Sequence, residues 1–152
     1  MKKILIATDG SPSADEAVEF GLELAVEQEA DPIFVHVVPA VDVLPGGGFG
    51  VTTAHIHDVT DADREPLEKA AKVATEHGVR ARTHLLRGDP VDEIVACADT
   101  IDADLIVIGS RGHGAILNAL LGSVSHGVLH EARRPVLIVR GVPVPAEMEV
   151  TS

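Results

Sequence analysis

The sequence predicts an α/β fold: a doubly wound, five-stranded, mainly parallel sheet with helices on both faces. Short apolar runs alternate along the chain with longer segments whose apolar residues have helical spacing. Strands of a parallel sheet that is covered on both faces are apolar throughout, and these runs have that character. The chain has 152 residues, of which 45% are apolar, which suits one domain with a single core.

Five segments are expected to form the strands: the apolar runs at residues 3–7, 32–39, 103–109 and 134–141, and residues 79–88, which alternate at their start. Because these runs and the helices between them form one continuous series, a single domain is expected over residues 1–141. A tail with two prolines follows at residues 142–152.

Four segments are expected to form helices, at residues 11–28, at 61–78, from 89 onward, and near 123–132. The first helix can be capped by Ser11, which precedes a proline, or by a box from Ser13 to Glu16. Asp89 and the proline after it mark the start of the third helix.

The faces of two of these helices follow from their spacing. In the second helix, the charged residues are expected to form a solvated face; they are Glu65, Glu68, Lys69, Lys72 and Glu76. In the fourth helix, the apolar residues are expected to point inward; they are Val124, Val128, Leu129 and Ala132.

The segment AVDVLPGGGFGVTTAHIH, residues 40–57, is rich in glycine and has no helical period. It is expected to be a long loop, which in a compact domain is usually either a functional lid or disordered.

Composition excludes several functional classes. The formal net charge is −12, from 24 acidic and 12 basic residues, and such a surface repels nucleic acid and anionic membranes. Aromatic residues make up 2% of the chain, so stacking platforms for single-stranded nucleic acid are not expected. There is no long uncharged apolar run that could span a membrane, and Asp9 interrupts the first one, so a cytoplasmic protein is expected. The acidic surface would also suit a cytoplasm at high salt, where charge is screened.

Cysteine and histidine give no clear metal or catalytic site. The single cysteine, Cys97, lies among apolar residues at helical spacing and is expected to be a buried, inert thiol. His126 and His130 are four residues apart on a helix, and His55 and His57 lie near the glycine-rich segment. Neither pair has a third ligand at a fixed spacing, so solvated or capping histidines are expected and the metal content stays unknown.

The stretch IGSRGHGAILNALLGSVSHGVL, residues 108–129, contains the pattern G-x2-G-x9-G-S at Gly109, Gly112, Gly122 and Ser123. The pattern starts at a strand end and finishes at a helix start, where Ser123 can cap the helix. A helix amino terminus offers unpaired N–H groups and a positive dipole end to an anion. Arg111 adds a cation whose planar donors suit phosphate.

Asp9 follows the first strand, in ATDGS, and is expected at the same edge of the sheet as this pattern. Ligands of open α/β sheets bind beyond the carboxyl ends of the strands. The Asp9 carboxylate could bind a ribose or adenine group or a metal, or it could cap the region of the first helix.

Other phosphate-binding patterns do not fit. No lysine follows these glycines as the Walker pattern requires, and ATDGSPSAD lacks the glycines of the dinucleotide fingerprint. The segment DGSPSAD is loosely similar to the pyrophosphatase loop of ATP-cleaving enzymes, S-G-G-x-D-S, but it lacks the second glycine.

The chain resembles the universal stress protein family over nearly its whole length. The resemblance rests on ILIATDGS, HVVP, GDPVDEIV, ADLIVIGSRGHG, LLGSVS and RRPVLIVR, and the glycine pattern is similar to the ATP-binding signature of that family. The resemblance implies a five-stranded doubly wound sheet that binds ATP, or AMP or ADP, with Mg²⁺. It also implies a homodimer through the last strand, residues 135–140, whose apolar edge would otherwise be exposed.

The resemblance assigns a role to each site residue. Ala7, Thr8 and Asp9 would lie on the nucleoside side, Val37 against the adenine and Gly109 near the ribose. The phosphates would be held by Arg111, Gly112, Gly122, Ser123, Val124 and Ser125.

The function implied is that of a nucleotide-dependent regulator or sensor in a stress response. Two alternatives stay open: an enzyme that uses the site for ATP hydrolysis or adenylyl chemistry, and a dimeric scaffold without nucleotide. No catalytic residue is assigned, because no base can be paired with Ser123.

Overall fold

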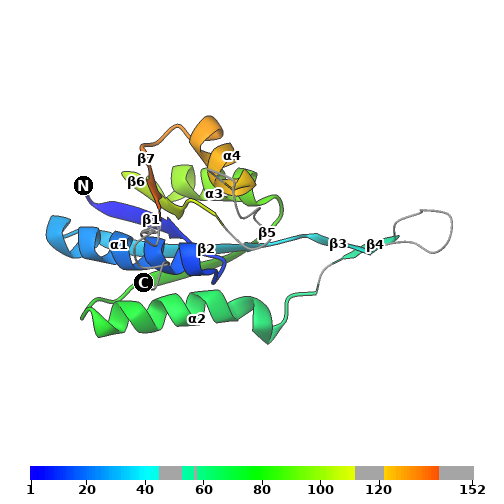
Figure 1. The fold of residues 1–152 in the computed structure, drawn as a ribbon, viewed down its shortest axis with the longest axis horizontal. Helices are drawn as coiled ribbons and strands as arrows, with labels where there is room; N and C mark the ends of the chain where they lie inside the picture. Colours follow the sequence, from blue (N-terminus) through cyan, green and yellow to red (C-terminus); the bar gives the residue numbers. More distant parts are fainter. Residues whose placement is uncertain (45–52, 57, 112–121, 141–152) are drawn as a thin grey trace, which may run out of the picture.

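The computed structural model describes residues 1–44, 53–56, 58–111 and 122–140 (Figure 1). The elements, in chain order, are β1 (Lys3–Ala7), α1 (Pro12–Gln28), β2 (Asp31–Val38), β3 (Val41–Leu44), β4 (Thr53–Ile56), α2 (Asp61–Glu76), β5 (Arg82–Arg87), α3 (Pro90–Ile101), β6 (Leu105–Gly109), α4 (Ser123–Glu131) and β7 (Val136–Val139).

Five strands form one parallel sheet in the order β5-β2-β1-β6-β7. In the middle of this sheet, Leu5 of β1 is in register with Ile33 of β2 on one side and with Ile106 of β6 on the other. The chain moves outward from β1 to β2 and β5, then crosses back to β6 and β7. The strand order therefore reverses between β1 and β6, which is where open α/β sheets form a crevice at the carboxyl ends of their strands.

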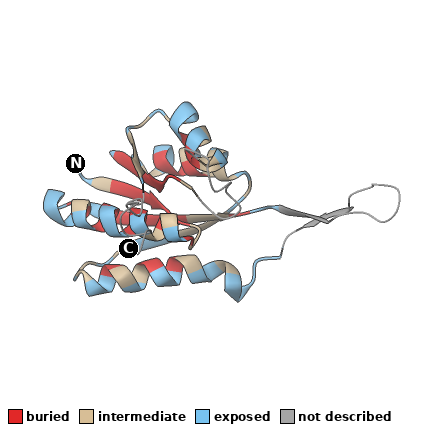
Figure 2. Ribbon diagram, in the orientation of Figure 1, coloured by how far each residue is buried: buried red, intermediate tan, exposed pale blue. Residues whose placement is uncertain are grey.

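The helices cover both faces of the sheet, and the strands between them are the most buried part of the fold (Figure 2). One apolar cluster joins α1 and α2 to alternate strand residues such as Ile4, Ile6 and Phe34. A second cluster joins α3 and α4 to the strand residues between them, among them Leu5 and Ile33. The three central strands, β1, β2 and β6, thus bury both of their sides, whereas the edge strands β5 and β7 are only partly buried, and the parallel sheet between two helical layers confirms the expected fold class.

Two predicted helix starts are confirmed. The Ser11 side chain accepts a hydrogen bond from the Ala14 N–H at 3.2 Å and caps α1, and Pro12 is the first helical residue. The Asp89 carboxylate accepts from the Asp92 N–H at 3.0 Å and caps α3 in the same way. In both helices, proline takes a position whose N–H would have no partner inside the helix.

Two expectations about the last helix were wrong. Gly122, with φ −72° and ψ 163°, is the capping residue of α4, and Ser123 is the first residue of the helix. Leu129 was expected to point inward, but it is 48% exposed, whereas Val128 beside it is fully buried. Of the α4 residues, Ser125 and Val128 are buried, so the neighbour of Val128 in sequence faces out.

The expected loop at residues 40–57 was also wrong in part. Strands β3 and β4 form an antiparallel pair within it, with Val41 opposite Ile56 and Leu44 opposite Thr53. This two-stranded ribbon projects from the end of β2 away from the body of the fold (Figure 1). Apolar and polar residues alternate in VDVL and TAHI, on either side of a glycine-rich stretch. Such alternation is typical of strands, and a search for helical period overlooks it.

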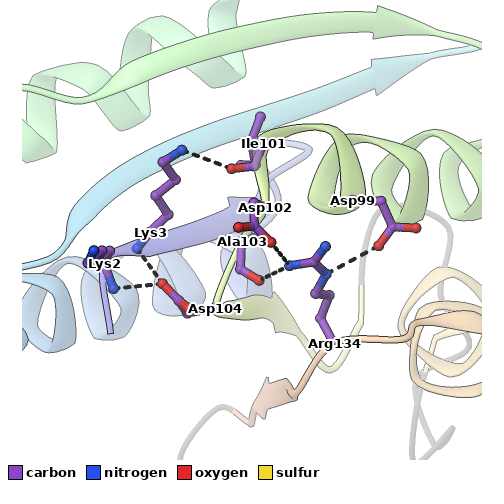
Figure 3. A network of polar contacts seen from close by, with 8 residues as sticks. All are labelled: Lys2, Lys3, Asp99, Ile101, Asp102, Ala103, Asp104 and Arg134. Atoms are coloured by element: carbon purple, nitrogen blue, oxygen red, sulfur yellow. Dashed lines mark hydrogen bonds and ion pairs between the residues drawn. The ribbon is translucent and has the colours of Figure 1, made fainter.

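At the amino ends of the strands, charged side chains tie neighbouring elements together (Figure 3). The Asp104 carboxylate, just before β6, accepts hydrogen bonds from the backbone N–H groups of Lys2 at 2.6 Å and Lys3 at 2.9 Å. These two bonds lower the pKa of the Asp104 carboxyl below its ordinary value. The Lys3 ammonium donates to the carbonyl of Ile101, at the end of α3, at 3.0 Å.

Arg134 continues this network toward β7 (Figure 3). Its guanidinium donates to Asp102 at 2.6 Å, to the Ala103 carbonyl at 2.9 Å and to Asp99 at 3.2 Å. The two carboxylates raise the pKa of the guanidinium. Arg134 therefore fixes the entry to β7 against the end of α3.

Cys97 is 9% exposed and lies in the apolar cluster under α3. Burial and, to a lesser extent, the nearby Glu93 carboxylate raise the pKa of its thiol. The thiol is therefore protonated and a poor nucleophile at neutral pH, which confirms the expectation of an inert, buried cysteine. In the described ranges, no helix is both long and apolar enough to cross a bilayer.

Candidate functional site

A cavity of about 780 Å³ opens at the carboxyl ends of β1, β2 and β6, where the strand order reverses. Its walls come from the turn after β1, the end of β2, the first turns of α2 and α3, the end of β6 and the first turn of α4. A volume of several hundred cubic ångströms is typical of sites for small molecules and cofactors.

The predicted site residues meet at this cavity. Those that line it are Ala7, Thr8, Asp9, Val37, Gly109, Arg111, Gly122, Ser123, Val124 and Ser125. Gly112 lies outside the described residues. The juxtaposition was expected from topology alone, because parallel strands bring their carboxyl ends to one edge of the sheet.

The turn after β1 is held by its own side chains. The Thr8 N–H donates to the Val35 carbonyl at 2.9 Å, which extends the β1–β2 pairing by one residue. The Asp9 carboxylate accepts from the Ser11 N–H at 2.9 Å. Gly10 between them has φ +79°, a conformation that residues with a Cβ rarely adopt. Asp9 therefore orders the entry to α1 while it also lines the cavity.

The α2 helix supports this turn from the other side of the cavity. A Cβ on Gly10 would lie 3.4 Å from Cγ of Pro66, so the helix packs directly against the turn. The Lys69 ammonium lies 2.6 Å from the Asp15 carboxylate and 3.4 Å from the Gly10 carbonyl oxygen. Lys69 and Glu65 are exposed, which confirms the solvated face expected for α2, and they also line the cavity.

Gly109, at the end of β6, is needed for packing. A Cβ there would lie 2.6 Å from the Ser13 carbonyl oxygen and 2.7 Å from its Oγ, closer than such atoms approach one another. The Arg111 N–H then donates to the same Ser13 Oγ at 3.1 Å. The first glycine of the pattern thus lets β6 pass against the first turn of α1, whatever ligand binds.

The Ser110 carbonyl oxygen joins the two ends of the glycine-rich segment. It accepts hydrogen bonds from the Gly122 N–H at 2.6 Å and from the Ser125 hydroxyl at 2.9 Å. The Ser125 Oγ also lies 3.0 Å from the Gly122 carbonyl, and the residue is 2% exposed. The Ser125 side chain therefore fixes α4 to the end of β6.

The first turn of α4 presents N–H groups at the cavity. The first intrahelical bond runs from the His126 N–H to the Gly122 carbonyl, at 2.9 Å. The N–H groups of Ser123, Val124 and Ser125 precede it and have no acceptor within the helix, and Gly122 has no side chain that could cap them. Together with the helix dipole, they form an anion-binding arrangement on the cavity wall.

The charges around the cavity are mixed. Three carboxylates line it, from Asp9, Asp63 and Glu65, and two cations, from Arg111 and Lys69. The anion-binding groups of α4 belong to the backbone, which adds no net charge. This site therefore attracts an anion through local N–H groups in a protein whose overall charge opposes anions.

Sequence reasoning missed His36 and the whole α2 wall. The His36 Nδ1 lies 2.9 Å from the Thr8 carbonyl, so the ring is held against the turn after β1. His36 stands next to Val37 in β2, and alternation along a strand places the two on opposite sides. The α2 residues carry no local signal, since the packing of α2 across β2 and β5 brings them to the cavity.

Among the described residues, one group of three side chains has the spacing of metal ligands, and it consists of Glu19, Glu23 and His77. It does not include His126 or His130.

Comparisons with known proteins agree with this architecture. The model of the universal stress protein family matches residues 1–140. A universal stress protein of Methanocaldococcus jannaschii is 38% identical over 142 residues, which cover 91% of this chain and 82% of that protein.

Two solved structures are similar in fold and carry nucleotides. A universal stress protein in complex with cAMP superposes with a TM-score of 0.68 at 27% identity, over 91% of this chain and 95% of that one. The universal stress protein from Archaeoglobus fulgidus in complex with dAMP gives a TM-score of 0.66 at 29% identity, over 91% and 97% of the two chains. By its sequence and its fold, the chain is a member of the universal stress protein family.

Proposed function

We propose that the chain binds an adenine nucleotide in the cavity at the carboxyl edge and acts as a nucleotide-dependent regulator or sensor in the cytoplasm. The observation that carries the proposal is the first turn of α4. Its residues line the cavity, their N–H groups have no acceptor within the helix, and the Ser110 carbonyl fixes the start of the helix relative to β6. The relatives that bind cAMP and dAMP add support, because both ligands pair an adenine with a single phosphate.

In this proposal, each wall of the cavity has a separate task. The phosphate lies at the first turn of α4 beside Arg111, where unpaired N–H groups and a guanidinium favour an anion. The nucleoside lies toward the turn after β1 and the end of β2, between Asp9 and Val37. The Asp9 carboxylate accepts hydrogen bonds from ribose hydroxyls while its other bond, to Ser11, holds the turn.

The lining charges also favour some nucleotides over others. Two cations face three carboxylates, and residues 112–121 add no lysine or arginine. A triphosphate therefore brings more negative charge than the site can neutralise, so we infer that ATP binds as its Mg²⁺ complex and that AMP needs no divalent cation.

Calorimetry with AMP, and with ATP in the presence and absence of Mg²⁺, tests this function. The expected result is binding of AMP and of Mg²⁺-ATP, with ATP alone weaker by about tenfold, or about 1.4 kcal/mol. A protein that gives neither heat nor a melting shift with any adenine nucleotide would refute the proposal.

Two pairs of variants locate the site. Gly122→Val adds bulk beside the α4 N–H groups and is expected to abolish binding, whereas Leu129→Ala, on the exposed side of the same helix and away from the cavity, serves as the control. Asp9→Asn keeps an oxygen that can accept from the Ser11 N–H but loses the charge, whereas Asp9→Ala loses both. If Asp9→Asn binds nucleotide as tightly as the unmodified protein does, the charge of Asp9 does not contribute to nucleotide binding. The side chain then serves the turn after β1.

We further propose that the protein is a homodimer through β7. In the described part of the sheet, β7 lies at the edge, and its residues Val136–Val139 are apolar and half-buried. An exposed apolar edge strand pairs readily with another chain, and pairing of two copies removes the hazard. Sedimentation should show a dimer that Ile138→Lys dissociates; a monomeric parent protein would contradict this assembly.

A further inference from the structure

A second cluster of chemically active side chains lies between α1 and the end of α2, and none of its members lines the nucleotide cavity. Glu19 and Glu23 are one helical turn apart on α1, and His77 is the C-cap residue of α2. One ligand atom from each of the three lies within 4.8 Å of the other two.

The orientation of the His77 ring is fixed by the backbone. Its Nδ1 lies 2.9 Å from the Val73 carbonyl oxygen, which only accepts hydrogen bonds, so Nδ1 carries a proton. In the neutral imidazole, Nε2 then holds a lone pair. A backbone carbonyl that holds one ring nitrogen in this way is the usual support of a metal-binding histidine.

The other ring nitrogen faces a carboxylate. Nε2 of His77 lies 3.2 Å from Oε2 of Glu19. With a neutral ring, two acceptors would confront each other at this distance, so either a proton or a cation must stand between them. The contact is thus favourable either with a proton on Nε2 or with a cation bound between the two atoms.

The surroundings favour a divalent cation in that place. Glu19 and Glu23 repel each other as like charges four residues apart on a helix, and α1 has no basic residue in its last turn that would offset them. Two carboxylates and one neutral imidazole carry a charge of −2, which a divalent ion neutralises completely. The protein as a whole, with net charge −12, adds to the attraction.

We propose that Glu19, Glu23 and His77 form a binding site for a divalent transition-metal ion, of which Zn²⁺ fits best. Imidazole nitrogen and carboxylate oxygen are both zinc ligands, and water can fill the remaining position at this partly exposed site. Ligands of a tetrahedral zinc ion lie about 3.4 Å apart. Exposed glutamate side chains can make the small adjustment from the present spacing, and the bound ion joins α1 to α2.

Titration of Zn²⁺ into the 152-residue chain, freed of metal and without nucleotide, tests this site. Calorimetry is expected to show one zinc ion per chain with micromolar affinity. Melting temperature should rise with zinc, because the ion binds the folded state. His77→Gln and Glu23→Gln should each weaken binding by about tenfold or more, since even loss of a residue that supports a ligand costs that much.

Two matched variants control for charge and for other histidines. Glu27→Gln removes one charge from the same helix, one turn beyond Glu23, and His130→Gln removes half of the His126/His130 pair on α4. Both should leave zinc affinity within about twofold of that of the parent protein, a change of about 0.4 kcal/mol. If Glu27→Gln and Glu23→Gln lose the same amount of zinc affinity, zinc binds through the overall negative charge of the helix. If only His130→Gln loses zinc affinity, the site lies on α4. Either result overturns the proposal.

Nitrogen-15 spectra of the histidine rings supply a readout of the geometry. Zinc should shift the Nε2 resonance of His77 and leave Nδ1 protonated, because Nδ1 donates to Val73. If Nε2 instead keeps its proton when zinc is present, the contact with Glu19 is an ion pair only and the metal site does not exist. The test is independent of the nucleotide cavity, so it stands whether or not adenine nucleotides bind.

Discussion

The two edges of the parallel sheet are built from different chemistry. At the amino edge, charged side chains such as Asp104 and Arg134 reach across elements and bind backbone groups, which closes that end of the fold (Figure 3). At the carboxyl edge, β6 is joined to α1 and α4 by backbone groups and by two hydroxyls, of Ser13 and Ser125, while the His36 ring and the Lys69 ammonium contact carbonyls of the turn after β1, and a cavity remains. Both edges join β1 and β6 to their neighbours, and at the carboxyl edge the first turn of α4 also has N–H groups without an acceptor in the helix.

The difference shows how an acidic protein can present an anion site. The charged side chains around the cavity, three carboxylates and two cations, give no net positive charge that would attract an anion. Backbone N–H groups hold an anion without a net charge of their own. We therefore expect substitutions at the carboxyl edge to change stability through steric clashes or lost hydrogen bonds. Substitutions at the amino edge should change stability by an amount that depends on pH.

The largest effect is expected for Gly109→Ala. The added Cβ would lie 2.6 Å from a backbone oxygen of α1, which cannot turn away as a flexible side chain would. Overpacking of this kind costs about 1–3 kcal/mol, and the upper end is expected here. Urea denaturation without nucleotide measures it, with Ser123→Ala as a control that should change stability by less than about 0.5 kcal/mol. If Gly109→Ala is as stable as the parent protein but loses nucleotide binding, this glycine serves the ligand and not the packing.

A smaller effect is expected for Ser125→Ala. The substitution removes the hydroxyl donor to the Ser110 carbonyl, but the Gly122 N–H still bonds that oxygen at 2.6 Å. Loss of one such bond costs about 0.5–1.5 kcal/mol. Because the Ser125 backbone N–H remains, nucleotide affinity should fall much less than in Gly122→Val. Chemical denaturation and calorimetry on the same sample separate the two effects; unchanged stability with lost binding would assign the hydroxyl to the phosphate.

The smallest effect is expected for Asp104→Asn, and it should depend on pH. Two backbone N–H groups lower the pKa of this carboxyl in the folded protein, so its contribution to stability is present above the ordinary carboxyl pKa and is lost as pH falls through the lowered one. The variant should melt slightly below the parent protein at pH 7, and the gap should close as the solution is acidified below about pH 4. Melting curves across this range measure the gap. If the difference in melting temperature stays constant to low pH, the negative charge of Asp104 does not contribute to its contact with β1.

The sequence by itself determined the order and the type of the main elements. Apolar runs such as KILIA and LIVIG bury both of their sides, which only a strand between two helical layers can do. Ser11 and Asp89 began helices as predicted because capping depends on groups within three residues of each other. The meeting of Asp9 with Gly122 at one edge followed from parallel topology, without any knowledge of distances.

Only the tertiary structure decided which distant residues touch. Gly109 is constrained by Ser13, almost a hundred positions earlier, and α2 forms a cavity wall with residues that read as a solvated face. Likewise, the contact of His77 with Glu19 joins two helices whose sequences give no sign of each other. The physical reason is that periodicity reports which side of an element is apolar, whereas the neighbour of each side chain depends on how whole elements pack.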